Sequence, residues 1–127
     1  MTTIKEDYVS FETAKLLKEK GFSEVECQNS PHFAYNMDGQ FSGPSWDTKY
    51  NAPTLQMAMK WLREVHNIHI VIKIVIRTYG DIEYYYELYG TKNKSLCVVC
   101  DIYKGETWSR SEQACEEAIK YCLEYLI

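Results

Sequence analysis

Apolar and polar side chains alternate one for one in the run IHIVIKIVI, residues 68–76. Alternate side chains of a β-strand point to opposite faces, so the five isoleucines of this run share one face. The pattern predicts a strand over about 68–78 whose isoleucine face is buried under helices. The runs IEYYYELY and LCVVCDIY predict further strands over about 82–89 and 96–103. Their short connections favour a three-stranded antiparallel meander.

Three other segments repeat apolar residues at helical spacing. They predict an N-terminal helix over about 10–20 and two further helices over about 53–66 and 110–126. The two later helices can both cover the isoleucine face, which gives a two-layer α+β sandwich.

Polar residues at the expected helix ends are suited to capping. Ser10 is expected to cap the first helix and Asn51 the second, while Ser109 and Glu112 match a capping box for the last. Asn67 is expected to end the second helix in a left-handed conformation.

The region before the second helix is less regular. Asp38-Gly39 favours a type I′ turn and predicts a short hairpin. The loop that follows makes 36–52 a candidate functional segment. The length of the chain, 127 residues, is that of one domain, so a single α+β domain over 1–127 is expected.

Composition narrows the classes of function. The net charge is −4, and neither half of the chain is strongly basic, which disfavours binding to nucleic acid. The start MTTIKEDYVS lacks the features of a secretory signal, and no apolar run is long enough to span a bilayer. A cytoplasmic location without a membrane partner is therefore expected. The five cysteines, an odd number, are expected to be reduced.

Two short motifs are candidates for chemistry, and packing explains each more simply. Cys97 and Cys100 form a CxxC inside a predicted strand rather than at a helix start, where a redox pair works. His66 and His69 form an HxxH without an acidic partner at motif spacing. No phosphate loop, nucleophile elbow or metalloprotease motif is present. No catalytic, cofactor-binding or metal-binding residue is assigned, and no cofactor is expected.

The face of the sheet opposite the isoleucines is the best candidate surface. It combines both signs of charge with tyrosines, which are favoured at interfaces. It is predicted to contain His69, Lys73, Arg77, Glu83, Tyr85, Glu87, Tyr89 and Tyr103. Three alternatives stay open: cross-strand charge pairs in solvent, cover by the N-terminal hairpin, or contact with a protein partner or a second copy of the chain.

Three stretches resemble a group of small uncharacterised proteins of gut bacteria and their phages. They are FETAKLLKEKGF, APTLQMAMKWLREVHNIHI and EQACEEAIKYCLEYLI, which together make up more than a third of the chain. The resemblance implies a phage or mobile-element origin and carries no activity.

The order helix, three strands, helix is also similar to the double-stranded-RNA-binding fold. That family places a lysine-rich patch at the start of its last helix, where this chain reads SRSEQACEE, with one arginine and three glutamates. The fold analogy therefore does not bring the function with it.

The sequence favours a non-enzymatic protein-interaction module, with a protein partner or a homodimer as its assembly. The first alternative is binding of nucleic acid through Lys73, Arg77, Lys92 and Lys94. The second is an enzyme with its site in the 36–52 loop.

We predict no tight binding to double-stranded RNA or DNA at physiological salt, because phosphate contacts need a surplus of basic groups. A mobility-shift assay at sub-micromolar protein checks this. A shift that Lys73→Glu combined with Arg77→Glu abolishes would instead establish the nucleic-acid alternative.

Overall fold

The computed structural model describes residues 7–22, 34–35, 40–42, 50–92, 95–101 and 107–127. The helical elements in this part of the chain are α1 (Phe11–Glu19), α2 (Leu55–His66), α3 (Ser111–Tyr121) and a π-helical turn, η2 (Cys122–Leu126). The strands are β1 (Ala34–Tyr35), β2 (Phe41–Ser42), β3 (Tyr50–Asn51), β4 (Ile68–Ile76), β5 (Ile82–Lys92) and β6 (Ser95–Asp101).

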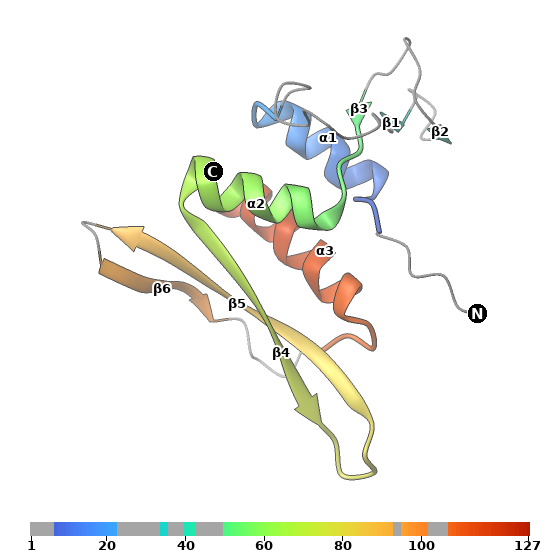
Figure 1. The fold of residues 1–127 in the computed structure, drawn as a ribbon, viewed down its shortest axis with the longest axis vertical. Helices are drawn as coiled ribbons and strands as arrows, with labels where there is room; N and C mark the ends of the chain where they lie inside the picture. The colour runs from blue at the N-terminus through green and yellow to red at the C-terminus, as the bar shows by residue number, and fades with distance from the viewer. Residues whose placement is uncertain (1–6, 23–33, 36–39, 43–49, 93–94, 102–106) are drawn as a thin grey trace.

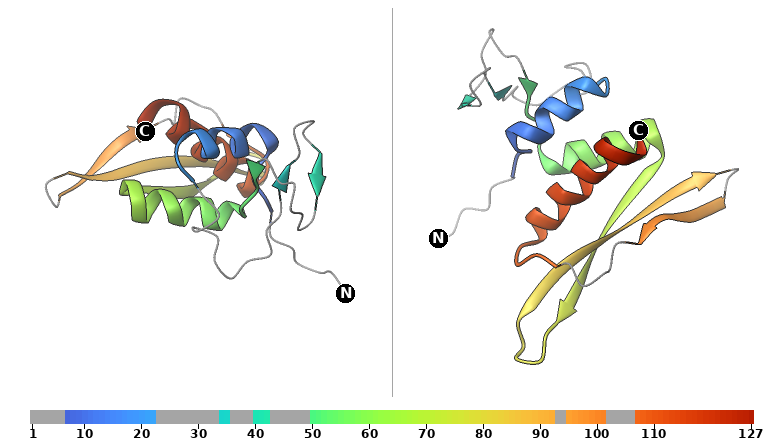
Figure 2. Two further views of the ribbon diagram at one scale, coloured as in Figure 1. Left: turned by 90° about the horizontal axis from the view of Figure 1, so that it is seen from above. Right: turned by 180° about the vertical axis from the view of Figure 1, so that it is seen from behind.

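The elements are arranged in layers, and the α+β class predicted from the sequence is confirmed. The larger sheet has the order β4-β5-β6, with antiparallel neighbours, and α2 and α3 pack on one of its faces. Helix α1 lies against α3 on the side away from this sheet, and the small sheet β2-β1-β3 lies beyond α1 (Figures 1 and 2). The described strands of the small sheet therefore do not cover the outer face of the larger one.

Two of the predicted helix ends are confirmed. The hydroxyl of Ser10 accepts a hydrogen bond from the backbone N–H of Thr13 at 3.3 Å, which caps α1. Asn67 ends α2 in the left-handed conformation, with φ of 58°.

The other two caps are corrected. Thr54, not Asn51, caps α2, because the helix begins at Leu55, two residues later than expected. The hydroxyl of Thr54 accepts a hydrogen bond from the N–H of Met57 at 3.1 Å. The expected capping box of Ser109 does not form, since α3 begins one residue later and has Arg110 at its N-cap without a side-chain hydrogen bond.

Strands β4 and β5 form a regular hairpin. Their register runs without a shift from Ile68 opposite Gly90 to Ile76 opposite Ile82. In the turn, the N–H of Arg77 donates to the carbonyl of Asp81 at 2.9 Å. Gly80 has φ of +85°, a value that favours glycine.

Strand boundaries differ from the expected ones. Strand β4 ends at 76 rather than 78, since the turn begins at Arg77, and β5 continues to Lys92 rather than 89 because it pairs with β6 along its second half. The pairing of β5 with β6 is irregular between Leu88 and Tyr89, where one extra residue of β6 is accommodated. The strict alternation expected for 96–103 therefore does not run through β6.

The core lies between the helices and the near half of the larger sheet. Its largest fully buried apolar side chains come from α1, α2, β5, α3 and η2, and from the segment before α1: Leu17, Leu62, Leu88, Ile119, Leu123, Cys122 and Val9. Two aromatic contacts border it. Phe22 meets Trp61 edge to face, with ring centroids 5.4 Å apart, and Tyr86 stacks on Trp108 at 5.6 Å.

The prediction that all five isoleucines of β4 are buried is wrong for the far half of the strand. Ile68 is buried, and Ile70 and Ile72 are half-buried. Ile74 and Ile76 are 61% and 73% exposed. The five side chains still share one face, but only the first part of that face has a layer of helix over it.

The lengths of the elements explain the difference. A helix of 12 residues spans about 18 Å at 1.5 Å per residue, so α2 has about that length. Helix α3 has 11 residues and spans about 17 Å, whereas a strand of nine residues spans about 30 Å, so β4 is longer than either helix that packs on it. The end of the β4–β5 hairpin therefore projects beyond the helices (Figure 1).

We predict that Ile68→Asp and Ile76→Asp differ strongly in stability, although both change an isoleucine on the same face. An unpaired charge at the buried position should cost about 3–5 kcal/mol, a large part of a typical total of about 5–15 kcal/mol. The exposed position should change the free energy of unfolding by no more than about 0.5 kcal/mol. Urea unfolding at low protein concentration measures both. Equal losses would show that the helices cover the whole face.

Candidate interaction surface

The hairpin brings most of the predicted surface residues together on its outer face. The register places His69 opposite Tyr89 and Lys73 opposite Tyr85. Glu83 and Glu87 on β5, and Arg77 just after β4, complete the group through the ion pairs below. The eighth predicted residue, Tyr103, lies outside the described residues.

Ion pairs connect the two strands on this face. Lys73 Nζ lies 3.2 Å from a carboxylate oxygen of Glu87, and Arg77 pairs with Glu83. The hydroxyl of Tyr89 donates to Glu87. Cross-strand charge pairing is one of the three alternatives that the sequence leaves open for this face.

The pairs shift the ionisation of both acids. The hydrogen bond from Tyr89 holds the pKa of Glu87 below its usual range, and Lys73 adds to the effect. The hydrogen bond from Arg77 lowers the pKa of Glu83, and the hydroxyl of Thr107 donates to the same carboxylate at 3.0 Å. The hydrogen bond to Glu87 raises the pKa of Lys73. Glu83, Glu87 and Lys73 are therefore charged at neutral pH.

The apolar end of the hairpin is a second surface, which the sequence reasoning missed. We call Ile74, Ile76, Tyr79 and Ile82 the apolar tip. Tyr79 in the turn is 94% exposed and Ile82 is 51% exposed, beside the two isoleucines of β4. Exposed apolar residues are ordinary when scattered, but a group on one face of one hairpin is typical of a binding surface. The signal in the sequence was the length of the alternating run, which exceeds the reach of the predicted helix.

The free edge of β4 is a third feature of the same hairpin. Strand β4 is at the end of the order β4-β5-β6, and no other strand of the described part pairs with its far edge. Such an edge presents unpaired backbone N–H and C=O groups to solvent.

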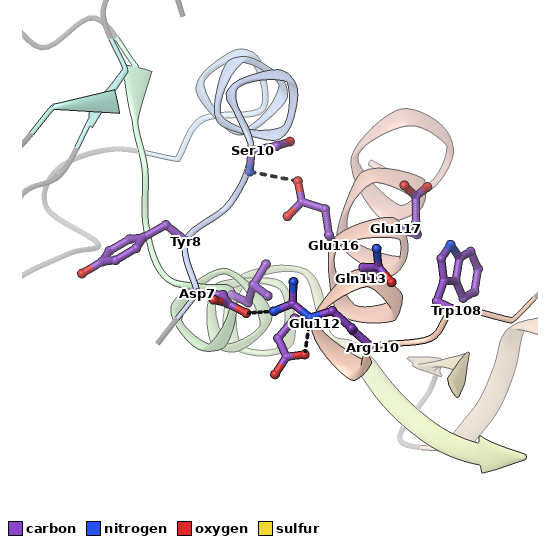
Figure 3. A pocket seen from close by; sticks show the side chains of 10 residues that line it. Asp7, Tyr8, Ser10, Trp108, Arg110, Glu112, Gln113, Glu116 and Glu117 are labelled. Atoms are coloured by element: carbon purple, nitrogen blue, oxygen red, sulfur yellow. Dashed lines mark hydrogen bonds and ion pairs between the residues drawn. The ribbon is translucent and has the colours of Figure 1, made fainter. Parts of the chain in front are cut away.

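A groove beside the start of α3 is the other candidate site (Figure 3). It has a volume of about 340 Å³ and lies between residues 7–10 and α3. Its charged groups bond to one another: Asp7 lies 3.1 Å from Arg110, which is 3.6 Å from Glu112.

Glu116, also in this groove, holds α1 against α3. One of its carboxylate oxygens accepts the backbone N–H of Ser10 at 2.9 Å and the hydroxyl of the buried Thr13 at 2.6 Å. A carboxylate at a helix N-terminus is also favoured by the helix dipole. These contacts give the groove a structural role, and they leave the carboxylate of Glu116 poorly suited to general-base chemistry.

Neither Cys115 and Cys122 nor the HxxH pair forms a metal site in the described part of the chain. Cys115 and Cys122 are free thiols and buried, and burial raises the pKa of the Cys115 thiol to about 11, which makes it a weak nucleophile at neutral pH. The ring of His66 packs edge to face on Trp61, with centroids 4.7 Å apart. Among the residues that the structure describes, no three His, Cys, Asp or Glu side chains are grouped to hold a metal ion.

The remaining residues predicted for an active site, a redox pair or a nucleic-acid contact lie outside the residues that the structure describes. Most of the 36–52 loop, the side chains of Cys97, Cys100 and Lys92, and Lys94 are among them. The enzyme alternative and the CxxC hypothesis therefore stay predictions.

Comparison with known proteins identifies no relative of this chain. No protein-family model, no curated protein and no solved structure matches it. In the described residues, none of the helices has the length and apolar character required to cross a bilayer.

We predict that replacing Arg77 by methionine raises the pKa of Glu83 toward the ordinary glutamate value and leaves the pKa of Glu87 unchanged. Arg77 is the largest cause of the lowered value at Glu83, whereas Tyr89 and Lys73 act on Glu87. Carbon-detected NMR titration of the side-chain carboxyls measures both.

The lowered pKa values of Glu83 and Glu87 make the stability of the folded chain depend on pH. A lowered folded-state pKa contributes stability above the ordinary glutamate pKa, and this contribution is lost as pH falls through the lowered value. The Arg77→Met protein should therefore lose less stability than the unchanged chain on acidification. Equal shifts at both glutamates would contradict separate ion pairs.

Proposed function

We propose that this chain is a non-enzymatic protein-interaction module that uses the β4–β5 hairpin as its contact element. The observation that supports it is the apolar tip, which projects beyond α2 and α3. Burying apolar surface contributes roughly 25 cal/mol per Å², so these side chains would contribute favourably to association. Tyr79 adds a large and rigid contact residue of a kind enriched in interfaces.

The charged outer face fits the same proposal as the border of an interface. Lys73 and Arg77 each already have a carboxylate partner, so the face is close to neutral. A neutral border does not repel proteins of either sign, and a polar rim around an apolar centre is the common anatomy of interfaces. Contact through Tyr85 and Tyr89 on this face is part of the proposal.

The nucleic-acid alternative has less support. Binding of phosphate by Lys73 or Arg77 would compete with Glu87 or Glu83, whose lowered pKa values keep them charged at neutral pH. A phage or mobile-element origin belongs to the proposal as well and is supported by the sequence resemblance alone.

Site-specific photocrosslinking tests the proposed function. We predict that p-benzoylphenylalanine in place of Ile76, on the apolar tip, forms protein adducts in cells of the natural source. The same group in place of Gln56, an exposed residue of α2 outside this hairpin, is the matched control. Mass spectrometry identifies the crosslinked chain.

The expected result is a discrete adduct at position 76 that is at least about tenfold more abundant than at position 56, as a specific contact requires. Ile74→Asp in the same protein should remove the adduct without unfolding the domain. Equal labelling at the two positions, or none at position 76, would overturn the proposed function.

A further inference from the structure

We infer that the free edge of β4 pairs with the free edge of β4 in a second copy of the chain, antiparallel, about a two-fold axis at Ile72. This inference rests on the proposed function, because it names the partner of the same hairpin. Four observations lead to it: the direction of the backbone groups, the absence of edge protection, the register of charges, and the position of uncovered apolar residues.

The backbone groups of the isoleucines point toward the free edge. Tyr84 exchanges two backbone hydrogen bonds of 2.8 Å with Trp108, on the side of β5 away from β4. Tyr84 therefore forms a non-hydrogen-bonded pair with Ile74, its partner in the register. The N–H and C=O of Ile74 point away from β5, and the same holds for every second residue from Ile68 to Ile76 because the register has no shift.

The edge lacks the features that usually prevent pairing between strands. Natural edge strands are protected by proline, bulges, short length or charged side chains. Strand β4 has nine residues, no proline and no bulge. Its one charged residue, Lys73, is already paired with Glu87.

Charge selects one register of the two-fold pairing. With the axis at Ile72, Lys73 lies opposite Val71 of the second copy, and Ile70 lies opposite Ile74. Moving the axis to Lys73 would place the two lysines opposite each other, which is destabilising. Moving it to Val71 would leave Ile76 without a strand partner. The axis at Ile72 pairs all five isoleucines.

This register also brings together the apolar residues that one chain leaves exposed. A two-fold axis perpendicular to the sheet keeps the helices of both copies on one face. Ile76 of one copy then lies opposite Ile68 of the other, at the end where α2 passes into β4. Val65, three residues before Ile68, is 52% exposed there, and Tyr79 of the first copy extends toward it. A second copy thus supplies cover for the half of the isoleucine face that α2 and α3 do not reach.

Amide hydrogen exchange of the unmodified protein tests the pairing. NMR measures the exchange rates at low and high micromolar protein concentration. In a single chain, the N–H groups of Ile70, Ile72 and Ile74 face solvent, while those of Val71 and Lys73 are bonded to β5. In the dimer both sets are bonded. We predict that exchange at the three isoleucines slows at least about tenfold as concentration rises, while exchange at Val71 and Lys73 changes much less. Fast exchange at the isoleucines at every concentration would overturn the inference.

Two substitutions at one position provide the matched variants. Ile74→Pro removes an N–H that points to the free edge and spares the pairing with β5, whereas Ile74→Val keeps that N–H. Light scattering should give twice 14.9 kDa for the unmodified chain and for Ile74→Val, and 14.9 kDa for Ile74→Pro. Circular dichroism confirms that each variant is folded. If Ile74→Pro is not folded, Ile74→Asp takes its place and should also be monomeric.

The outcomes separate this inference from the proposed function. An unmodified chain that stays at 14.9 kDa overturns the dimer. If the group at position 76 then crosslinks a different protein, the proposed function holds with another partner at this edge. If it crosslinks nothing, both fail.

Discussion

The structure depends on a mismatch in length between one strand, β4, and the two helices that pack on it. Alternation over nine residues gives β4 an apolar face about 30 Å long, whereas α2 and α3, with 12 and 11 residues, are each only about 17–18 Å long. The near half of the hairpin provides the core, where Leu88 is fully buried between the sheet and the helices. The far half extends beyond this core. One alternating run of residues therefore provides both the buried face and the apolar tip.

On the outer face of the hairpin and in the groove beside α3, charged side chains are paired with other groups of the chain. On the outer face, Lys73 and Arg77 are each matched by a glutamate of β5. In the middle of α3, Glu116 accepts two hydrogen bonds from the beginning of α1, and Asp7 pairs with Arg110 just before α3. Charged groups in both regions are thus bonded within the chain. The exposed isoleucines of the hairpin are left as the surface with most to gain from a partner.

The sequence predicted the local structure of this domain better than its extent. Period-two alternation predicted β4 and β5. It also predicted that His69, Lys73 and Arg77 share one face with Glu83 and Glu87, because alternation is a property of the strand itself. Burial of Ile74 and Ile76 was predicted wrongly, because cover depends on where another element ends. The Asn51 cap was predicted wrongly because α2 begins at Leu55, which makes Thr54 the N-cap residue.

The apolar tip is also not required by the fold. Ile74 and Ile76 are largely exposed, so the hairpin would also form with polar residues at these positions. Its strands are held together by backbone hydrogen bonds between β4 and β5 and by ion pairs on the other face. Five isoleucines in strict alternation instead extend the apolar face to the end of the strand and along a free edge. Such an edge with an apolar face favours pairing with another strand over remaining in water. A second copy of β4 provides such a strand, because the covered half of its isoleucine face aligns with the exposed half of the first copy.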